Sequence, residues 1–277
     1  MFQEWGGMFP ECAVTKAISN RSGEDNRSRE PSLTGDRPSP ILTLRQMKPN
    51  RKLAETTTPD GGRLILYEHD GAYCIRLNGQ DLMHSSVTAS ELRLGELAAE
   101  KLSDLTDSRS LLGGLGLGFT LRGLLENSGP GAKVHVVELI PEIVDWNRNL
   151  LPHLNGRLLD DPRVEVLLRD VWSVIADGEP AQYDALVLDV DNGPTGMVQK
   201  RNTQIYSRKG LERVFNVLRP GGRALFWSAG GDAAFRERLT RAGFRTDVVP
   251  APLYAGAKRC AVSIYVADKQ TTKGVDL

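Results

Sequence analysis

The alternation of short apolar runs with helical stretches, from Ser110 onward, constrains the fold of this chain most. The runs read SLLGGL, KVHVVEL, RVEVLL, YDALVLDV and RALFWS, and segments of helical periodicity lie between them. Such alternation is typical of βαβ units on a parallel sheet. At 218–222 the segment Leu-Arg-Pro-Gly-Gly precedes the last of these runs, and it should end a helix and reverse the chain into the strand. Beyond Gly243 the runs FRTDVVP and CAVSIYVA predict an antiparallel pair of edge strands. The sequence therefore predicts an α/β, Rossmann-like fold whose mostly parallel sheet has an antiparallel C-terminal edge.

A smaller antiparallel β unit is predicted ahead of this domain. Across residues 63–86, strand-like runs are separated by Asp-Gly at 70–71 and Asn-Gly at 78–79, which are dipeptides that favour tight hairpin turns. A helix should follow, because Thr88 and Glu91 have the spacing of a capping box and leucines recur beyond them at helical intervals.

The start of the chain has a different composition from the rest. From Ser19 to Asn50 it is rich in Ser, Arg, Asp and Pro, so that ordering it would not be offset by burial. A compact pattern begins only afterwards, and we hypothesise that Met47 is the translation start; native peptides upstream of it in mass spectrometry would refute this. We predict a disordered leader (1–50), a small N-terminal β-hairpin domain (51–87), the Rossmann-like domain (88–268) and a disordered tail (269–277).

Charge and cysteine usage argue against several classes of protein. The 277 residues include 35 basic and 35 acidic side chains without a long run of either sign, so the chain lacks the electrostatic footprint of a nucleic-acid or membrane-surface binder. Its three cysteines lie far apart, which favours a reducing cytoplasm over a disulfide framework or a zinc site. We expect a cytoplasmic protein that acts on a small molecule, with no metal, nucleic-acid or membrane partner. A homodimer stays open.

A glycine-rich turn, Gly113-Gly114-Leu115-Gly116-Leu117-Gly118, follows the first strand of the α/β domain and opens a helix. Its glycines let the backbone approach a ligand, and the helix N-terminus supplies free N–H groups. Similar turns also serve only to pack a helix tightly on a strand. Glu138, at the end of the next strand, favours a nucleotide site, because an acid there can accept hydrogen bonds from ribose hydroxyls. A nicotinamide dinucleotide would give the same two signals.

Further acids follow the later strands. Asp170 closes RVEVLLRD and Asp189 closes YDALVLDV, at the carboxyl ends of strands, where open α/β sheets bind ligands. An aspartate at a strand end can equally cap the next helix, and both roles stay open for Asp170. Asp191 lies two residues beyond Asp189, in a stretch that Gly193-Pro194 prevents from continuing as a strand. Two carboxylates at one site suit a cationic substrate.

This ordered set of motifs is similar to that of the spermidine synthase (polyamine aminopropyltransferase) family, which has the class I methyltransferase fold. In that family the acids that match Glu138 and Asp170 hold the ribose and the adenine of the cofactor, and the aspartate that matches Asp189 helps to deprotonate the attacking amine. Tyr254, in PLYAG, resembles a tyrosine of the family's Pro-Thr-Tyr-Pro-Ser-Gly segment. The resemblance covers roughly Arg63 to Ala267 and rests on GGLGLGFTLRGLL, VVELIPEIVDWNR, DDPRVEVLLRD, YDALVLDVDNGP, the Tyr-Ser pair at 206–207 and LRPGG.

Three positions depart from the family pattern. The glycine turn has leucines at 115 and 117, where the family's GGGDGG carries an aspartate. The Asp-Ser-Ser-Asp-Pro motif is shortened to Asp-Val-Asp-Asn at 189–192, and the helix with Asp-Glu…Tyr reads SELRL at 90–94. Glu91 and Glu96 could replace a lost acid, although glutamates on a helix are more often solvated.

The resemblance implies transfer of an aminopropyl group from decarboxylated S-adenosylmethionine to a polyamine or related amine. The lost acid keeps two alternatives open: a methyltransferase that uses S-adenosylmethionine, and a catalytically silent nucleoside-binding protein. On the transferase reading the expected catalytic residues are Asp189, Asp191 and Tyr254. The expected cofactor-binding residues are Gly113, Gly114, Gly116, Gly118, Glu138 and Asp170, and no metal is required.

Overall fold

The computed structural model describes residues 49–271 except 104, 191–199 and 258, and of Lys200 and Arg201 only the backbone. Met47 and nearly all of the predicted leader lie outside the described residues, as does most of the predicted tail. The predicted site residue Asp191 also lies outside them.

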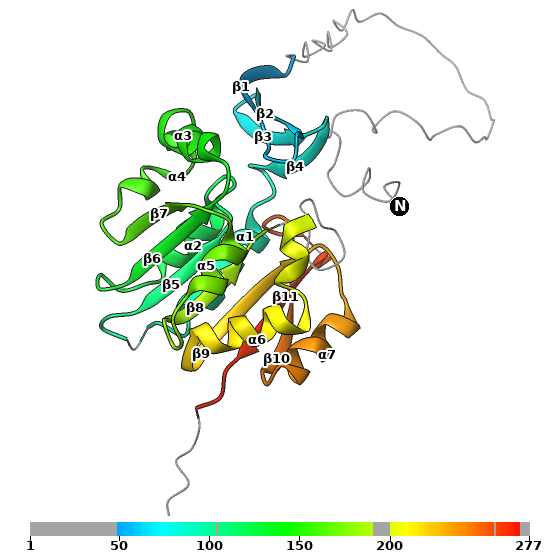
Figure 1. Ribbon diagram of the computed structural model, residues 1–277. Coiled ribbons are helices and arrows are strands. Elements are labelled where there is room, and N and C mark those ends of the chain that lie inside the picture. The colour runs from blue at the N-terminus through cyan, green and yellow to red at the C-terminus, as the bar shows by residue number, and fades with distance from the viewer. Residues whose placement is uncertain (1–48, 104, 191–199, 258, 272–277) are drawn as a thin grey trace, which may run out of the picture. The chain divides into compact units, whose positions relative to one another are not determined.

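A small antiparallel sheet begins the described part of the chain (Figure 1). Both predicted hairpin turns are confirmed: the Asp-Gly at 70–71 and the Asn-Gly at 78–79 have positive φ at both residues. Beyond the expected hairpins, a further strand pairs with the first of them. The strands pair in chain order, β1 (Arg51–Thr57), β2 (Arg63–His69), β3 (Ala72–Leu77) and β4 (Gln80–His84).

A seven-stranded sheet in the order β10-β11-β9-β8-β5-β6-β7 forms the main domain, and it confirms the predicted fold class. Neighbours from β7 across to β9 are parallel, whereas β11 runs antiparallel to both β9 and β10. The chain leaves β5 toward β6 and returns on its other side as β8, which makes the carboxyl ends of β5 and β8 the topological switch point. The strands are β5 (Arg109–Gly113), β6 (Lys133–Glu138), β7 (Val164–Leu168), β8 (Tyr183–Leu188), β9 (Leu218–Ser228), β10 (Arg245–Ala251) and β11 (Val262–Asp268).

Helices cover both faces of this sheet (Figure 1). On one face lie α1 (Ala89–Ala99), α2 (Phe119–Glu126) and α3 (Pro141–Asn149); on the other lie α5 (Val171–Asp177), α6 (Arg208–Val217) and α7 (Ala233–Arg241). Successive strand residues therefore enter different cores, as Leu111 and Leu112 do. The remaining helices are short: α4 (Pro152–Asn155) and the 3₁₀ turns η1 (Leu158–Asp160) and η2 (Lys200–Gln204).

The small sheet shares a core with the first helical layer. Leu64, Leu66, Tyr73 and Ile75 are buried in the same cluster as the apolar side chains of α1, α2 and α3. The ring of Tyr73 also lies 4.7 Å from that of His153 in α4. The small sheet therefore packs beside the elements that follow the glycine turn.

Two local expectations were wrong. Thr88 does precede α1, but its side chain makes no capping hydrogen bond, and Glu91 is not the capping-box partner. The Leu-Arg-Pro-Gly-Gly segment was expected to end a helix before the strand, yet α6 ends at Val217 and β9 already begins at Leu218. The segment instead lies in an irregular start of β9, where the register with β8 shifts and Gly221 has a φ of +83°.

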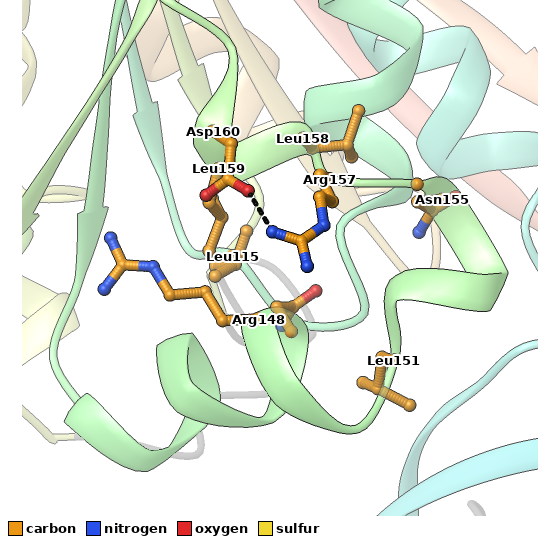
Figure 2. A pocket seen from close by; sticks show the side chains of 10 residues that line it. Leu115, Arg148, Leu151, Asn155, Arg157, Leu158, Leu159 and Asp160 are labelled. Atoms are coloured by element: carbon orange, nitrogen blue, oxygen red, sulfur yellow. Dashed lines mark hydrogen bonds and ion pairs between the residues drawn. The ribbon is translucent and has the colours of Figure 1, made fainter.

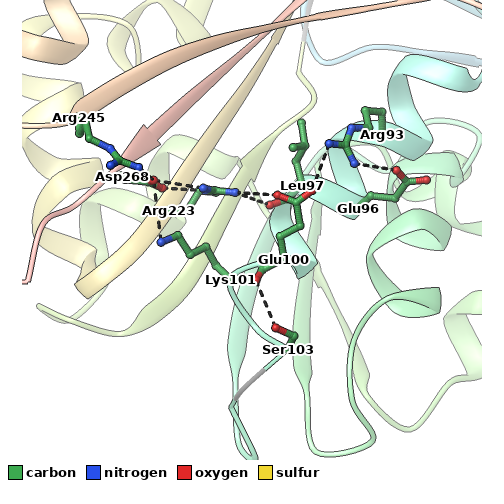
Figure 3. A network of polar contacts seen from close by, with 9 residues as sticks. All are labelled: Arg93, Glu96, Leu97, Glu100, Lys101, Ser103, Arg223, Arg245 and Asp268. Carbon is green, nitrogen blue, oxygen red and sulfur yellow. Dashed lines mark hydrogen bonds and ion pairs between the residues drawn. The ribbon is translucent and has the colours of Figure 1, made fainter.

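A charged network ties the C-terminal end of α1 to the sheet (Figure 3). Arg223 of β9 binds both carboxylate oxygens of the buried Asp268, at 2.7 and 3.2 Å, and donates to the carbonyl oxygen of Leu97 at 3.0 Å. Arg245 and Lys101 approach the same carboxylate from β10 and from the chain after α1. These cations lower the pKa of Asp268 despite its burial. The contacts fix one end of α1, whose other end lies at the candidate site.

Candidate functional site

The glycine turn leaves β5 with positive φ at alternate residues, Gly114, Gly116 and Gly118. A Cβ at Gly114 would overlap the carbonyl oxygen of Asp189, and a Cβ at Gly116 would overlap the sulfur of Met83 in β4. At Gly114 the overlapping atom belongs to the backbone and cannot move aside, whereas at Gly116 it ends a flexible side chain, so the left-handed φ of +53° is the stronger reason for glycine there. This close packing agrees with the alternative that such a turn serves to pack a helix on a strand. Binding of a nucleoside by the turn therefore stays a prediction.

Glu138 clamps the turn to the end of β6. Its two carboxylate oxygens accept hydrogen bonds from the backbone N–H of Leu115, at 3.0 Å, and of Ile140, at 2.9 Å. Burial raises its pKa, and backbone N–H groups around it offset part of that rise. The carboxylate therefore organises the turn through backbone hydrogen bonds.

Two amides hold the turn from its other side. Asn147 of α3 donates to the carbonyl oxygen of Gly116 at 2.9 Å, and Asn155 of α4 donates to that of Leu117 at 2.7 Å. Next to these amides lies a small open pocket, at whose rim Arg157 and Asp160 form an ion pair (Figure 2). None of the predicted acids lines this pocket, so it lies behind the turn rather than at the predicted site.

Asp170 acts as a helix cap. It is the N-cap of α5, and its Oδ1 accepts from the backbone N–H of Ser173 at 3.0 Å. Helix capping is the structural role that the sequence left open, and it uses Oδ1 of Asp170. The hydrogen bond to adenine that the family resemblance implies stays a prediction for Oδ2.

Asp189 lies where β8 ends, directly beside the glycine turn. Its backbone N–H donates to the carbonyl oxygen of Gly113 at 3.0 Å, and its Oδ2 accepts from the Thr120 hydroxyl of α2 at 2.6 Å. Burial raises the pKa of Asp189 to about 6, and the Thr120 hydrogen bond offsets part of the rise. A carboxyl group with a pKa so close to neutrality is suited to accept a proton and release it again.

Among the described residues, no recorded hydrogen bond or ion pair brings the predicted catalytic residue Tyr254 to Asp189. Asp191 lies outside the described residues. Tyr254 is 51% exposed, in the loop between β10 and β11. This loop does reach α1, because the carbonyl oxygen of Leu253 accepts from the backbone N–H of Ala89 at 3.2 Å. The catalytic role of Tyr254 remains a prediction.

Glu91 is a residue of the site that the sequence reasoning undervalued. It was expected to be solvated, but it is only partly exposed, and burial together with the charge of Asp189 raises its pKa well above its usual range. The position of Glu91 on α1 could have indicated this burial, because Leu94, Gly95 and Ala98 lie on the same face of the helix and are all buried. Glu96 matches the expectation: its side chain is 42% exposed and pairs with Arg93 at 3.1 Å.

Some kinds of site were not found in the described part of the chain. No group of three or more His, Cys, Asp or Glu side chains there could hold a metal ion. Nor does any described helix have the length and apolar character to cross a membrane.

Comparison with known sequences points to enzymes of polyamines. Residues 107–234, just under half of the chain, match the family model described as Spermine/spermidine synthase domain. Putrescine N-methyltransferase 1 of Nicotiana tabacum is 32% identical over 112 residues, which are 40% of this chain and 28% of that protein. Polyamine aminopropyltransferase of Mycobacterium tuberculosis (strain ATCC 25618 / H37Rv) is 33% identical over 138 residues, 49% of this chain and 25% of that protein. The matches thus span little more than a quarter of these relatives.

Comparison with solved structures supports the same fold. A spermidine synthase in complex with the transition state analogue AdoDATO has a TM-score of 0.63 at 19% identity, with 80% of this chain and 75% of that chain covered. Spermidine synthase from Thermotoga maritima has a TM-score of 0.60 at 17% identity, with 80% and 74% covered. The chain therefore has the methyltransferase-like fold of spermidine synthases and carries a segment that matches their domain model.

Proposed function

Because the chain carries a segment that matches the spermine/spermidine synthase domain, we propose that it transfers an aminopropyl group from decarboxylated S-adenosylmethionine to a polyamine or related amine. The observation that carries this proposal is the position of Asp189, at the carboxyl end of β8 and bonded to both β5 and α2. A proton acceptor is needed there, since an amine is protonated at neutral pH and cannot attack carbon in that form.

The residues of the turn suit a nucleoside. α2 has Gly118 as its N-cap and no side-chain cap, so its first N–H groups can donate to hydroxyl or ring acceptors of a bound nucleoside. Glu138, at the end of β6 beside the turn, is the acid expected to accept from ribose hydroxyls. One adjustment is required: the Met83 side chain lies against Gly116 and would have to turn away, which a flexible thioether chain can do at low cost.

In the proposed reaction the amine nitrogen attacks the carbon bonded to sulfur. The C–S bond breaks, its electron pair stays on sulfur, and a neutral thioether leaves. Asp189 takes the proton that the amine must lose, while the turn and Glu138 hold the nucleoside in line with the amine. The sulfonium already activates the carbon, so this chain mainly positions the reactants and adjusts charge.

One observation favours methyl transfer instead. Leu115 and Leu117 are buried in the apolar core at 5% and 2% exposure, so the turn offers no carboxylate to the ammonium of a bound aminopropyl group. Putrescine N-methyltransferases are also among the similar curated proteins. S-adenosylmethionine would then be the donor, and the acceptor would again be an amine.

Calorimetric titration with S-adenosylmethionine, its decarboxylated form and methylthioadenosine separates these functions. For aminopropyl transfer we expect the decarboxylated donor to bind, and we expect mass spectrometry of a reaction with putrescine to show a product of the mass of spermidine. Tight binding of only the carboxylated donor would reject that function in favour of methyl transfer. If the chain binds none of the three, both enzyme functions are wrong.

A single substitution tests the proposed role of Asp189. Asp189→Asn keeps the size and the Thr120 hydrogen bond but removes the proton acceptor, so turnover should fall by roughly 100-fold or more while nucleoside affinity stays nearly unchanged. Activity within a few-fold of the unmodified protein would show that Asp189 is not the proton acceptor.

A further inference from the structure

The first turn of α1 is held against the strand ends at the candidate site. Trp227 of β9 donates from Nε1 to the Ser90 hydroxyl at 3.2 Å, and the backbone N–H of Ala89 donates to Leu253. Ser90 is 1% exposed. Because Glu91 is the next residue, these contacts fix the position from which its side chain starts.

Two glycines bring α1 unusually close to α2. A Cβ at Gly95 would overlap the α2 backbone at Thr120 and Leu124, and a Cβ at Gly123 would overlap the carbonyl oxygen of Leu92. The helices therefore meet backbone to backbone. Thr120, at this contact, is also the residue that bonds Asp189. The close approach thus places the first turn of α1 beside the same carboxylate.

Glu91 and Asp189 lie together, and no described side chain compensates their charge with a cation. Among the described residues neither carboxylate forms an ion pair, and the hydrogen bond from Thr120 is the one recorded for either side chain. Arg93 is close in sequence to Glu91, but it pairs with Glu96 at 3.1 Å and with Glu100 at 3.2 Å instead. Burial raises the pKa of both Glu91 and Asp189, and the charge of Asp189 adds to the rise at Glu91.

Two partly buried carboxylates without a cation are costly, because each disfavours the charged form of the other. A bound cation would remove this cost and would be held by two charge-assisted hydrogen bonds. The site has no carboxylate on the glycine turn, whose leucines at 115 and 117 are buried. Among the described residues, the carboxylates left to bind a cation at the site are those of α1 and of the end of β8.

We propose that Glu91 is an amine-binding residue, and that it and Asp189 together hold the ammonium group of the acceptor at the carboxyl end of β8. The inference rests on the proposed function and narrows its acceptor to a cationic primary amine, as opposed to a neutral hydroxyl or an anion. When the ammonium gives a proton to Asp189, its nitrogen becomes neutral and able to attack, and Glu91 stays beside it as the carboxylate that faces the positive charge which the nitrogen regains on forming the new C–N bond.

The test measures putrescine binding by calorimetry in the presence of methylthioadenosine. Glu91→Gln should weaken putrescine binding by at least about ten-fold, because one of two charged partners of a desolvated ammonium is lost. Methylthioadenosine affinity should stay within about two-fold, since no hydrogen bond or ion pair among the described residues joins Glu91 to the turn. Glu96→Gln, on the same helix but at the surface, is the matched control and should leave both affinities unchanged.

A stability measurement guards against misfolding of the variant. Removing a negative charge beside Asp189 should raise the melting temperature of the ligand-free Glu91→Gln protein, so a variant that is more stable yet binds putrescine less tightly supports the proposal. Unchanged putrescine binding in a variant that still takes methylthioadenosine would overturn this inference alone. If the unmodified chain binds putrescine through Glu91 but takes none of the nucleosides, the proposed transfer fails and the amine site stands. Binding of neither ligand would overturn both.

Discussion

The raised pKa of Asp189 makes a quantitative prediction about stability. Its pKa rises from 3.8 to about 6 in the folded protein, a difference of about two units. One unit corresponds to about 1.4 kcal/mol, so the charged carboxylate costs the folded state about 3 kcal/mol above the folded pKa. Asp189→Asn removes that charge and keeps an oxygen for Thr120. We therefore expect the variant to be more stable than the unmodified protein near pH 8, by up to about 3 kcal/mol.

The sign of the pH dependence follows from the direction of the shift. A carboxyl group whose pKa is higher in the folded state favours folding while it is protonated. That contribution is fully present below the unfolded pKa of 3.8 and is lost as the pH rises through about 6. The advantage of Asp189→Asn should therefore shrink to about half at about pH 5, where the unfolded chain is already largely ionised and the folded one is not.

Urea unfolding of the two proteins at about pH 5 and about pH 8 measures this difference. Comparing the variant with the unmodified chain at each pH cancels the titration of the other acids. Glu96→Gln serves as a control and should change the free energy of unfolding by less than about 0.5 kcal/mol at both pH values. If Asp189→Asn raised the free energy of unfolding equally at the two pH values, or lowered it near pH 8, burial would not be what raises the pKa of Asp189.

Three further substitutions test the packing around the site. Gly95→Ala puts a methyl group into the α2 backbone and should destabilise the fold by roughly 1–3 kcal/mol in urea unfolding, whereas Gly129→Ala, which meets no atom within 4 Å, should have little effect. Asp268→Ala leaves the mostly buried Arg223 guanidinium with the more exposed Glu100 as its acidic partner and should cost about 3–5 kcal/mol; a loss below about 1 kcal/mol would mean that Glu100 and water replace the pair. Gly116→Ala should lower the free energy of unfolding, because alanine is strained at a φ of +53° and its Cβ would also overlap the flexible Met83 side chain; adding Met83→Ala should restore only the part due to overlap, and complete rescue would show that the backbone is not strained there.

Much of the fold followed from local patterns. The hairpin dipeptides at 70–71 and 78–79 predicted turns that the structure has, because positive φ is a property of the residues themselves. The strand and helix alternation likewise predicted the parallel sheet and its antiparallel edge. The capping box failed, because Thr88 and Glu91 had the right spacing but other contacts determine the first turn of α1. The expectation for the Pro-Gly-Gly segment failed as well, because this segment forms part of β9.

The sequence by itself determined the order of the elements and the acids that end the strands, Glu138, Asp170 and Asp189, since both depend on spacing along the chain. Only the tertiary structure decided what surrounds them. It uses Asp170 as a helix cap, ties Glu138 to the turn, and brings Glu91 from a helix far away in the sequence to Asp189. The two carboxyl groups lose water and come close to each other only when α1 packs on α2 through Gly95 and Gly123. A contact between segments that are distant in the sequence leaves no periodic pattern in either segment, so the sequence alone does not reveal it.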